Sequence, residues 1–401
     1  METMLPYRAL DLTGELGWLC GKILADWGAD VIKVEPPGGD PGRSAEPSVA
    51  GSDGSVSLAW LAFNVGKRSV VLDLEDDADR DRFLRLVEAS DFVLESFTPG
   101  YLGRLGLSFE RLRAVNPRII LTSITPYGQS TPGAAAPASD LEIMAAGGAA
   151  WLAGDPDRPP VRITEPQAGA WASLHAALGT LVAHHYRQNS GVGQHVDVSA
   201  QAAVVTALAH APYFYDLNGE VPARHGPFLV GRNVAGVAMR NVWACRDGHI
   251  SFAVYGGVAG RTSNRHLVSW MAERGMAPDW LLAVDWDTFD VTALTAVEVA
   301  RLEAAIAPFV ATLTRREFAE EAARRRILGY PVSRADDIAS DPQLDAREVW
   351  QDVTVAELGR PLLYPSGFPR FGSTVPRLAR RAPLPGEHDA EILGQPVAGQ
   401  R

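Results

Sequence analysis

The stretch LDLTGELGWLCGKILADWGADVIKVE, residues 10–35, decides the fold class. A short apolar run is followed by a turn with Gly14, Gly17 and Gly21, by apolar residues at helical spacing, and by a second apolar run that ends at Glu35. This order predicts two parallel strands joined by a right-handed helical crossover. The glycine spacing is not G-x-G-x-x-G, so the turn is open to three interpretations: an NAD site, a site for another nucleotide-bearing ligand, or an ordinary tight turn.

The alternation of strand and helix continues beyond this stretch. We expect strands at 68–74, 91–97 and 118–124, with amphipathic helices at 77–90 and 108–116 between them. Strict alternation predicts a parallel, doubly wound α/β sheet. The later part of the chain predicts helices around a Gly/Pro-rich loop, a strand and a helix at 190–208, a β-rich piece at 220–260 with a hairpin around Asp247-Gly248, mainly helices at 261–325, and short strands in the tail.

Length, charge and cysteine content limit the possible functions. A chain of 401 residues is too long for one ordinary core and predicts two domains, or one domain with an insertion. The net charge of -11 argues against nucleic acid as a partner, and no apolar run approaches the roughly 18 residues that span a membrane. Two distant cysteines cannot form a zinc cluster or a disulfide framework, and no signal peptide is visible, so we expect a cytoplasmic protein without a metal.

Two turns carry residues that suit an anionic ligand. Lys67 and Arg68 follow a glycine at the start of a strand, where adjacent cations either bind a phosphate or form an ordinary solvated turn. Phe97 and Arg104 flank a Pro-Gly turn at the carboxyl end of a strand, which is where open α/β sheets bind ligands. A packing Phe and a surface Arg are the alternative interpretation of the second turn.

A second stretch, PPVRITEPQAGAWASLHAALGTL at 159–181, predicts a loop that runs into a helix. Thr164 and Gln167 fit a capping box, with Pro166 in the first turn. Gly169 then lies within the first two turns, where glycine costs about 0.5–1 kcal/mol against alanine, so the position either requires a close approach or has no need of a side chain. The expected apolar stripe of this helix is Trp171, Leu174, Leu178 and Leu181.

Several segments together resemble the CoA-transferases of family III. The matching text is ADWGADVIKVEPPGGDPGR, FNVGKRSVVLDL, ESFTPGYLGRLGLSFERLRAVNPRIILTSITPYG, SGVGQHVDVS and RAPLPGEHDAEILG, in the order of the family and over nearly the whole chain. The resemblance implies a Rossmann-like large domain made of residues 1–215 and 329–401, a smaller α+β domain inserted at 216–328, and a dimer whose subunits interlock like linked rings.

The resemblance also implies coenzyme A as the ligand and a covalent mechanism. An aspartate attacks the acyl-CoA thioester and carries first the acyl group and then CoA. The lead-in PVRITEP places the position of that aspartate at Gly169, which has no carboxylate. Asp140 matches an acidic position of the family, but no His accompanies it as the racemase branch requires. By the same resemblance, the residues that line the CoA site are Leu16, Lys67, Ser96, Phe97 and Arg104, with Lys67 and Arg104 as partners of the phosphates.

Three functions are open to a chain with this substitution. The first is the nucleophile-free subunit of a heteromeric CoA-transferase, completed by a homologous Asp-bearing subunit, as in the succinyl-CoA-dependent benzylsuccinate CoA-transferase. The second is a self-sufficient enzyme that uses Glu165, one helical turn before Gly169. The third is a CoA-thioester-binding protein without turnover. The residues do not name the acyl donor or the acceptor acid, and the glycine-containing segment 254–261 is the expected local contributor to their choice.

Overall fold

The computed structural model describes residues 5–52, 54–365, 369, 372, 378 and 380–394. The chain divides into two compact units: unit 1 comprises residues 1–150, 162–221 and 341–401, and unit 2 comprises residues 151–161 and 222–340. The prediction had placed the boundaries after residues 215 and 328 and had left 151–161 in the large domain. This segment belongs to unit 2 because the Arg224 guanidinium donates to the backbone carbonyl oxygens of Trp151, Asp155 and Arg158.

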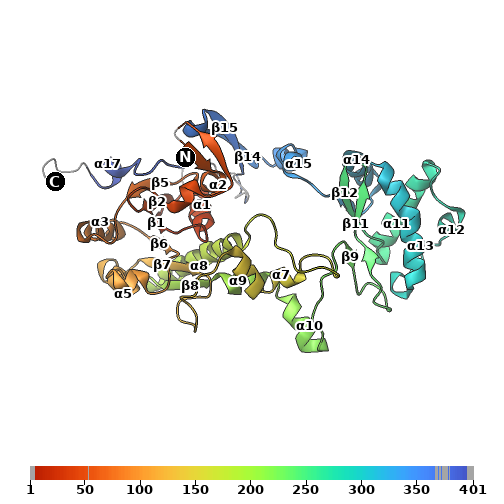
Figure 1. Ribbon diagram of the computed structural model, residues 1–401, viewed down its shortest axis with the longest axis horizontal. Helices are drawn as coiled ribbons and strands as arrows, with labels where there is room; N and C mark the ends of the chain where they lie inside the picture. Colours follow the sequence, from red (N-terminus) through yellow and green to blue (C-terminus); the bar gives the residue numbers. More distant parts are fainter. Residues whose placement is uncertain are drawn as a thin grey trace. The chain divides into compact units, whose positions relative to one another are not determined.

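Unit 1 is built on a six-stranded sheet (Figure 1). Its strands are β1 (Arg8–Leu12), β2 (Asp30–Glu35), β5 (Arg68–Val71), β6 (Phe92–Glu95), β7 (Ile120–Thr125) and β8 (His195–Ser199). They lie in the order β5-β2-β1-β6-β7-β8, and every neighbouring pair is parallel, which confirms the predicted parallel α/β sheet. Counted along the chain, this is the order 3-2-1-4-5-6 of the Rossmann fold, which reverses direction between β1 and β6.

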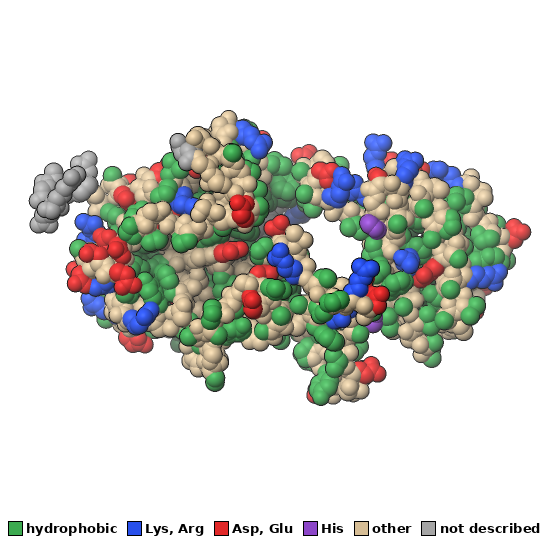
Figure 2. Space-filling view, in the orientation of Figure 1, with side chains coloured by type: hydrophobic (Ala, Val, Ile, Leu, Met, Phe, Trp, Pro, Cys, Tyr) green, Lys and Arg blue, Asp and Glu red, His purple; other side chains and the backbone are tan. Residues whose placement is uncertain are grey.

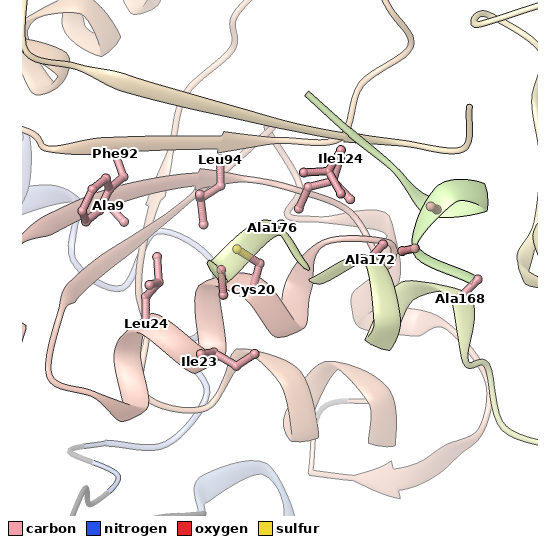
Figure 3. Packing of buried hydrophobic residues seen from close by; sticks show 14 of the residues in the cluster. Ala9, Cys20, Ile23, Leu24, Phe92, Leu94, Ile124, Ala168, Ala172 and Ala176 are labelled. Atoms are coloured by element: carbon pink, nitrogen blue, oxygen red, sulfur yellow. The ribbon is translucent and has the colours of Figure 1, made fainter. Parts of the chain in front are cut away.

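Helices cover both faces of this sheet. They are α1 (Trp18–Asp26) and α8 (Ala168–Ser190) on one face, and α3 (Asp77–Glu88) and α5 (Phe109–Val115) on the other. On the first face, Cys20, Ile23 and Leu24 of α1 meet the alanines of α8 and apolar side chains of β1 and β6 (Figure 3). Strands covered on both faces read as nearly continuous apolar runs, which is the pattern of residues 10–35.

The apolar stripe predicted for α8 is oriented differently in the structure. The buried face of α8 consists mainly of small side chains, among them Ala168, Ala172 and Ala176, whereas Leu174 and Leu178 are 48% and 62% exposed. Small residues allow α8 to lie close to α1 and the sheet, so Leu174 and Leu178 point outward. The other two residues of the predicted stripe, Trp171 and Leu181, are partly buried and pack against the core. The outward-facing residues, which we call the outer stripe of α8, are Leu174, Leu178, Val182 and Tyr186.

The last part of the chain returns to unit 1. β14 (Trp350–Val355) and β15 (Arg360–Pro365) pair antiparallel and pack on the core cluster around Trp60. Farther along, the His388 N–H donates to the carbonyl oxygen of Ser69 on β5. The other elements of unit 1 are η1 (Pro41–Ser44), β3 (Ser48–Gly51), β4 (Gly54–Ser57), α2 (Leu58–Asn64), α4 (Tyr101–Arg104), α6 (Asp140–Ala146), α9 (Ala200–Ala207), α10 (His210–Asn218), α16 (Pro342–Ala346), η3 (Ala356–Leu358) and α17 (Asp389–Ile392).

Unit 2 combines helices with short strands around its own core. The hairpin predicted around Asp247-Gly248 is present. The core of unit 2 contains Trp243 and Phe252 of this hairpin together with Trp270 of the following helix. The elements are β9 (Phe228–Leu229), β10 (Met239–Arg240), β11 (Val242–Cys245), β12 (Gly248–Phe252), α11 (Gly257–Glu273), α12 (Asp279–Leu282), η2 (Val291–Ala293), α13 (Ala296–Thr312), α14 (Arg315–Arg325), β13 (Gly329–Pro331) and α15 (Ala335–Ala339), while α7 (Ala149–Leu152) crosses the boundary between the units.

Helix α10 of unit 1 has no buried residue. Tyr213, Phe214, Tyr215 and Leu217 are between 49% and 79% exposed, and we call these four side chains the α10 face. Figure 2 shows hydrophobic side chains gathered over this helix. A contiguous apolar surface of this kind is typical of a site that another molecule covers.

Candidate functional site

A cavity of about 680 Å³ opens in unit 1 at the carboxyl ends of β1 and β6. The strand order reverses between these two strands, and open α/β sheets bind their ligands at such a switch point. The loop after β1 contributes Thr13, Gly14 and Glu15 to the lining, and the loop after β6 contributes Ser96 and Phe97. The volume is that of a small-molecule site.

Two hydrogen bonds shape the part of the cavity between these loops. The Gly14 N–H donates to Ser96 Oγ at 2.8 Å and so ties the two loops together. The Phe97 N–H donates to Glu95 Oε2 at 2.7 Å, and the Phe97 ring lies 4.7 Å from the Tyr101 ring. Ser96 and Phe97, which were predicted to lie at the ligand site, therefore line the cavity together, and the ring of Phe97 is paired with that of Tyr101.

Lys67 has a different role from the predicted one. Its ammonium is completely buried and donates to Asp11 Oδ2 at 2.7 Å, Asn64 Oδ1 at 2.8 Å and the Trp18 carbonyl oxygen at 2.9 Å. An ammonium has three N–H donors, so none is left for a phosphate. The prediction that Lys67 binds the phosphates is corrected by this geometry: Lys67 supports the start of α1 after the cavity loop.

A second buried lysine, which the sequence analysis missed, supports the same loop. Lys33 lies within β2, is 1% exposed, and donates to the Thr13 carbonyl oxygen and to Asp40. Burial raises the pKa of Asp11, but the charges of Lys67 and Lys33 outweigh this effect and hold the pKa below its usual value. The available signal was a lysine inside an otherwise apolar strand, DVIKVE, because a charge is buried only with a partner.

Arg104 remains suited to an anionic ligand. It is exposed at the end of α4, and its guanidinium lies 5.4 Å from the ring of Tyr101, which lines the cavity. Within the described part of the chain it forms no ion pair. The cavity itself has an acidic rim of Glu15, Asp73 and Glu75, and Glu75 accepts from the Tyr101 hydroxyl at 2.9 Å.

The start of α8 depends on a residue distant in sequence. Asp140 Oδ1 accepts from the N–H groups of Gln167 and Ala168, each at 2.7 Å, and the helix dipole favours a carboxylate at this end. The predicted capping box is wrong, because the helix begins at Ala168, Gln167 is its N-cap without a side-chain cap hydrogen bond, and Thr164 lies outside it. Asp140 supplies the acceptor that Thr164 was expected to provide.

Gly169 is the second residue of α8 and lies against the loop after β1. A Cβ at this position would meet the Glu15 carbonyl oxygen at 3.3 Å, Leu16 Cα at 3.4 Å and the Leu16 carbonyl oxygen at 3.5 Å. The contact with the Glu15 carbonyl oxygen is tighter than ordinary van der Waals contact, so a side chain at 169 requires this loop to shift by a few tenths of an ångström; the backbone of Gly169 is not left-handed. Leu16 is partly buried, packs against the core, and accepts from Ser173 Oγ at 3.2 Å. The position of the missing aspartate thus adjoins the cavity loop.

Glu165 does not lie where a substitute nucleophile on the same helical face would lie. It is exposed and precedes the N-cap Gln167, so it is not one helical turn before Gly169. Glu15 is among the residues that line the cavity, and its carbonyl oxygen borders the space that a side chain at 169 would occupy.

The described residues contain neither a metal-binding cluster nor a membrane-spanning helix. Among these residues, no group of three or more His, Cys, Asp or Glu side chains is arranged to hold a metal ion. Likewise, none of their helices has both the length and the apolar character needed to cross a bilayer. Cys20 and Cys245 are unpaired.

Comparisons with known proteins identify relatives along the whole chain. The model of CoA-transferase family III matches residues 8–389. The succinyl-CoA:(R)-benzylsuccinate CoA-transferase subunit BbsE of Thauera aromatica is 37% identical over 96% of this chain and 92% of that protein. The succinyl-CoA:mesaconate CoA-transferase of Haloarcula hispanica is 32% identical over 98% of this chain and 96% of that protein. The succinyl-CoA–L-malate CoA-transferase beta subunit of Chloroflexus aurantiacus is 29% identical over 93% of this chain and 89% of that protein.

The fold is shared with a solved structure. A CAIB/BAIF family protein from Brucella suis superposes with a TM-score of 0.82 at 28% identity, and the match covers 98% of this chain and 99% of that one. This similarity supports the parallel α/β architecture described above.

Proposed function

The chain belongs to CoA-transferase family III, and on this premise we propose that it is the nucleophile-free subunit of a heteromeric CoA-transferase. Its substrate is an acyl-CoA, and the partner is a homologous Asp-bearing subunit that interlocks with it. The observation that carries the proposal is Gly169. The helix start, the Asp140 cap and the adjoining loop are all present, but the position itself has no carboxylate.

The switch-point cavity is the proposed site for the nucleotide part of CoA. Phe97 and Tyr101 offer aromatic faces for the adenine ring, and the Gly14–Ser96 contact holds the two loops at the cavity. Arg104 is the proposed phosphate ligand because it is exposed next to Tyr101 and free of ion pairs within the described residues. The acidic rim of the cavity limits the affinity, since CoA is an anion.

In the proposed reaction, the covalent work is done by the aspartate of the partner subunit. Its carboxylate attacks the thioester carbon of the donor acyl-CoA, the C–S bond breaks, and CoA leaves as a thiolate. The thiolate then attacks the aspartyl carbon of the mixed anhydride, which forms an enzyme thioester and releases the donor acid. The acceptor acid repeats both steps in reverse and leaves as the new acyl-CoA. The present chain contributes binding surface and completes the fold of the partner subunit.

Two apolar surfaces support a partner chain. The outer stripe of α8 and the α10 face leave large hydrophobic side chains exposed in this chain, and obligate interfaces are rich in such residues. Two of the relatives are themselves named as subunits, which supports a heteromer over a homodimer. We propose the cytoplasm as the compartment, in keeping with two unpaired cysteines.

For the donor we propose succinyl-CoA, because the three relatives described above carry it in their names. The acceptor is a free carboxylic acid. We propose that the segment 254–261 of unit 2, which leads into α11, takes part in choosing it.

Restoring the carboxylate tests this proposal directly. We expect the purified wild-type chain alone to transfer CoA only at background level. The Gly169→Asp variant should gain transfer from succinyl-CoA to an acid, because it restores the carboxylate at the cost of only a small shift of the Glu15–Leu16 backbone. A hydroxylamine-sensitive adduct should map to residue 169 in that variant. Gly169→Ala is the matched control, since it adds the same Cβ without an oxygen and should stay inactive.

The position of Glu15 supports a second candidate, a self-sufficient enzyme. If the wild-type chain alone turns over robustly, the nucleophile-free proposal is wrong. Loss of that activity in Glu15→Gln, with an adduct on Glu15 and full activity in Glu165→Gln, would then establish Glu15 as the nucleophile. CoA binding without transfer, even with every homologous partner added, would instead support a CoA-thioester-binding protein.

A further inference from the structure

A row of polar side chains crosses the carboxyl ends of three neighbouring strands in unit 1. Glu95 on β6 is in register with Ser123 on β7, and Ser123 is in register with Asp197 on β8. Glu95 is 4% exposed and Ser123 is 1% exposed. Burying a carboxylate is costly unless it is paired or hydrogen-bonded, and the charge that acts on Glu95 is the like charge of Asp197. Because this arrangement lowers the stability of the fold, a functional role explains the row better than a structural one.

Glu95 connects the cavity to the surface through this row. On one side, its Oε2 accepts from the Phe97 N–H at 2.7 Å. On the other side, Ser123 on β7 is the register partner of Glu95, and Ser123 Oγ lies 2.8 Å from His195 Nε2. His195 is exposed and stacks on the ring of Phe109, with the ring centres 5.6 Å apart. Glu95, Ser123 and His195 thus form a row of polar side chains from the cavity turn to the surface.

We propose that Glu95 is a positioning residue of the CoA cavity, and that its charge state sets both how firmly the Ser96–Phe97 turn is held and the direction of the hydrogen bonds through Ser123 to His195. The ligand in this inference rests on the proposed function, whereas the row of polar side chains does not. Glu95 itself is adjacent to the cavity lining and acts through the main chain of Phe97.

The two charge states of Glu95 require opposite proton arrangements. An ionised Glu95 accepts from the Ser123 O–H, so Ser123 Oγ accepts in turn from an N–H on His195 Nε2. A protonated Glu95 donates to Ser123, which then donates to a bare Nε2, and the ring proton of His195 moves to Nδ1. Each switch between the two charge states moves protons only between Glu95, Ser123 and His195, and no bond between heavy atoms changes.

The electrostatic surroundings allow this switch near neutral pH. Burial raises the pKa of Glu95 to about 7, and the charge of Asp197 adds to the rise. Burial lowers the pKa of His195 and so favours the neutral imidazole, against the opposing charges of Asp197 on β8 and Glu110 on α5.

The ring nitrogens of His195 report the arrangement without any ligand. In protein labelled with ring-¹⁵N histidine at pH 8, we expect wild type to carry the proton on Nε2. Glu95→Gln should carry it on Nδ1, because the amide donates to Ser123 as a protonated carboxyl would. Ser123→Ala should remove the dependence on residue 95, Glu110→Gln should match wild type, and His195→Gln identifies the signal. The same tautomer in wild type and Glu95→Gln would overturn the proposal.

CoA binding tests the effect on the cavity. A charged acceptor strengthens the bond from Phe97 N–H, so we expect the affinity of wild type for CoA to be about fivefold higher at pH 8 than at pH 6, relative to the same ratio in Glu95→Gln. The comparison with Glu95→Gln cancels the titration of the CoA phosphate, which falls in the same range. Parallel pH profiles in calorimetric titrations would refute the positioning role. Absence of CoA binding at every pH, with the tautomer difference intact, would refute the proposed function instead.

Discussion

At the scale of single residues, Lys67 and Arg104 show how far two cations with similar sequence settings can differ. Both follow glycine-containing turns near strand ends, and both are candidates for a phosphate. Lys67 is fully buried with its three donors used within the fold, whereas Arg104 is exposed beside the cavity. Only Arg104 keeps donors for a ligand. Replacing Lys67 should therefore affect stability, whereas replacing Arg104 should affect ligand binding.

We predict opposite phenotypes for the two substitutions. Lys67→Met leaves the buried Asp11 carboxylate without its ammonium and should lower the free energy of unfolding by about 3–5 kcal/mol. Arg104→Ala should change it by less than about 0.5 kcal/mol but weaken CoA binding about tenfold. Urea denaturation and CoA titration of both variants check this. Arg113→Ala, an exposed arginine on α5, is the charge-matched control and should alter neither quantity. Unchanged CoA affinity in Arg104→Ala would remove it from the site.

At the scale of elements, α8 is the helix on which the site and the interface both depend. Its first turn carries Gly169 and is held by Asp140, its inner face of small residues packs on α1 and the sheet (Figure 3), and its outer stripe faces away from this core. One helix therefore places the lost nucleophile and presents an apolar surface to a partner. These two roles can be separated by mutation.

Replacing the outer stripe should break association without unfolding the chain. Leu174 and Leu178 are about half exposed or more in the single chain, 48% and 62% respectively. Full burial of a leucine contributes about 1.5–3 kcal/mol, and a partner that covers the exposed half of each side chain gains about half of this, so Leu174→Gln/Leu178→Gln should weaken the complex at least about tenfold. Sedimentation velocity of the complex measures this effect, and thermal unfolding of the free chain should change little. Val297→Gln, at 78% exposed on α13 of unit 2, is the control. Undiminished association in the double variant would place the interface elsewhere.

At the scale of the whole molecule, the pH dependence of the unfolding free energy is the sum of contributions from groups whose pKa values are shifted in opposite directions. Burial raises the pKa values of Asp11, Asp30 and Glu35, but ion pairs and hydrogen bonds bring them below the usual value, so their stabilisation is present above that value and is lost as acid protonates them. Burial lowers the pKa values of His184, His195 and His388, so stability also falls as the pH drops below about 6.5. Glu95 acts in the opposite direction.

The contribution of Glu95 can be isolated by difference. Burial raises its pKa to about 7 from the usual 4.5, so the folded state binds more protons than the unfolded state between these values and stability falls as the pH rises through that range. The unfolding free energy of wild type minus that of Glu95→Gln should decrease by on the order of 3 kcal/mol between pH 4.5 and pH 8. Urea denaturation at several pH values provides the measurement. A difference independent of pH would mean that Glu95 ionises normally.

Local patterns in the sequence account for much of this molecule. Apolar runs and helical spacing report which faces are buried, so residues 10–35 and the following alternation predicted the parallel α/β sheet that the structure shows. The position of a strand end was also predictable, and it brought Ser96 and Phe97 to the cavity. The glycine at 169 is likewise visible in the sequence alone, because the absence of a side chain does not depend on its surroundings.

Contacts between distant segments decided the rest. Asp140 caps a helix that begins at Ala168, Lys67 pairs with Asp11, and Glu95 lies in register with Ser123, which contacts His195. None of these pairs is close in sequence, and each depends on how the strands are ordered and which crossover precedes them. The inward face of α8 was decided in the same way, since helical spacing marks two apolar faces and only the close approach of α1 selects the one made of small side chains.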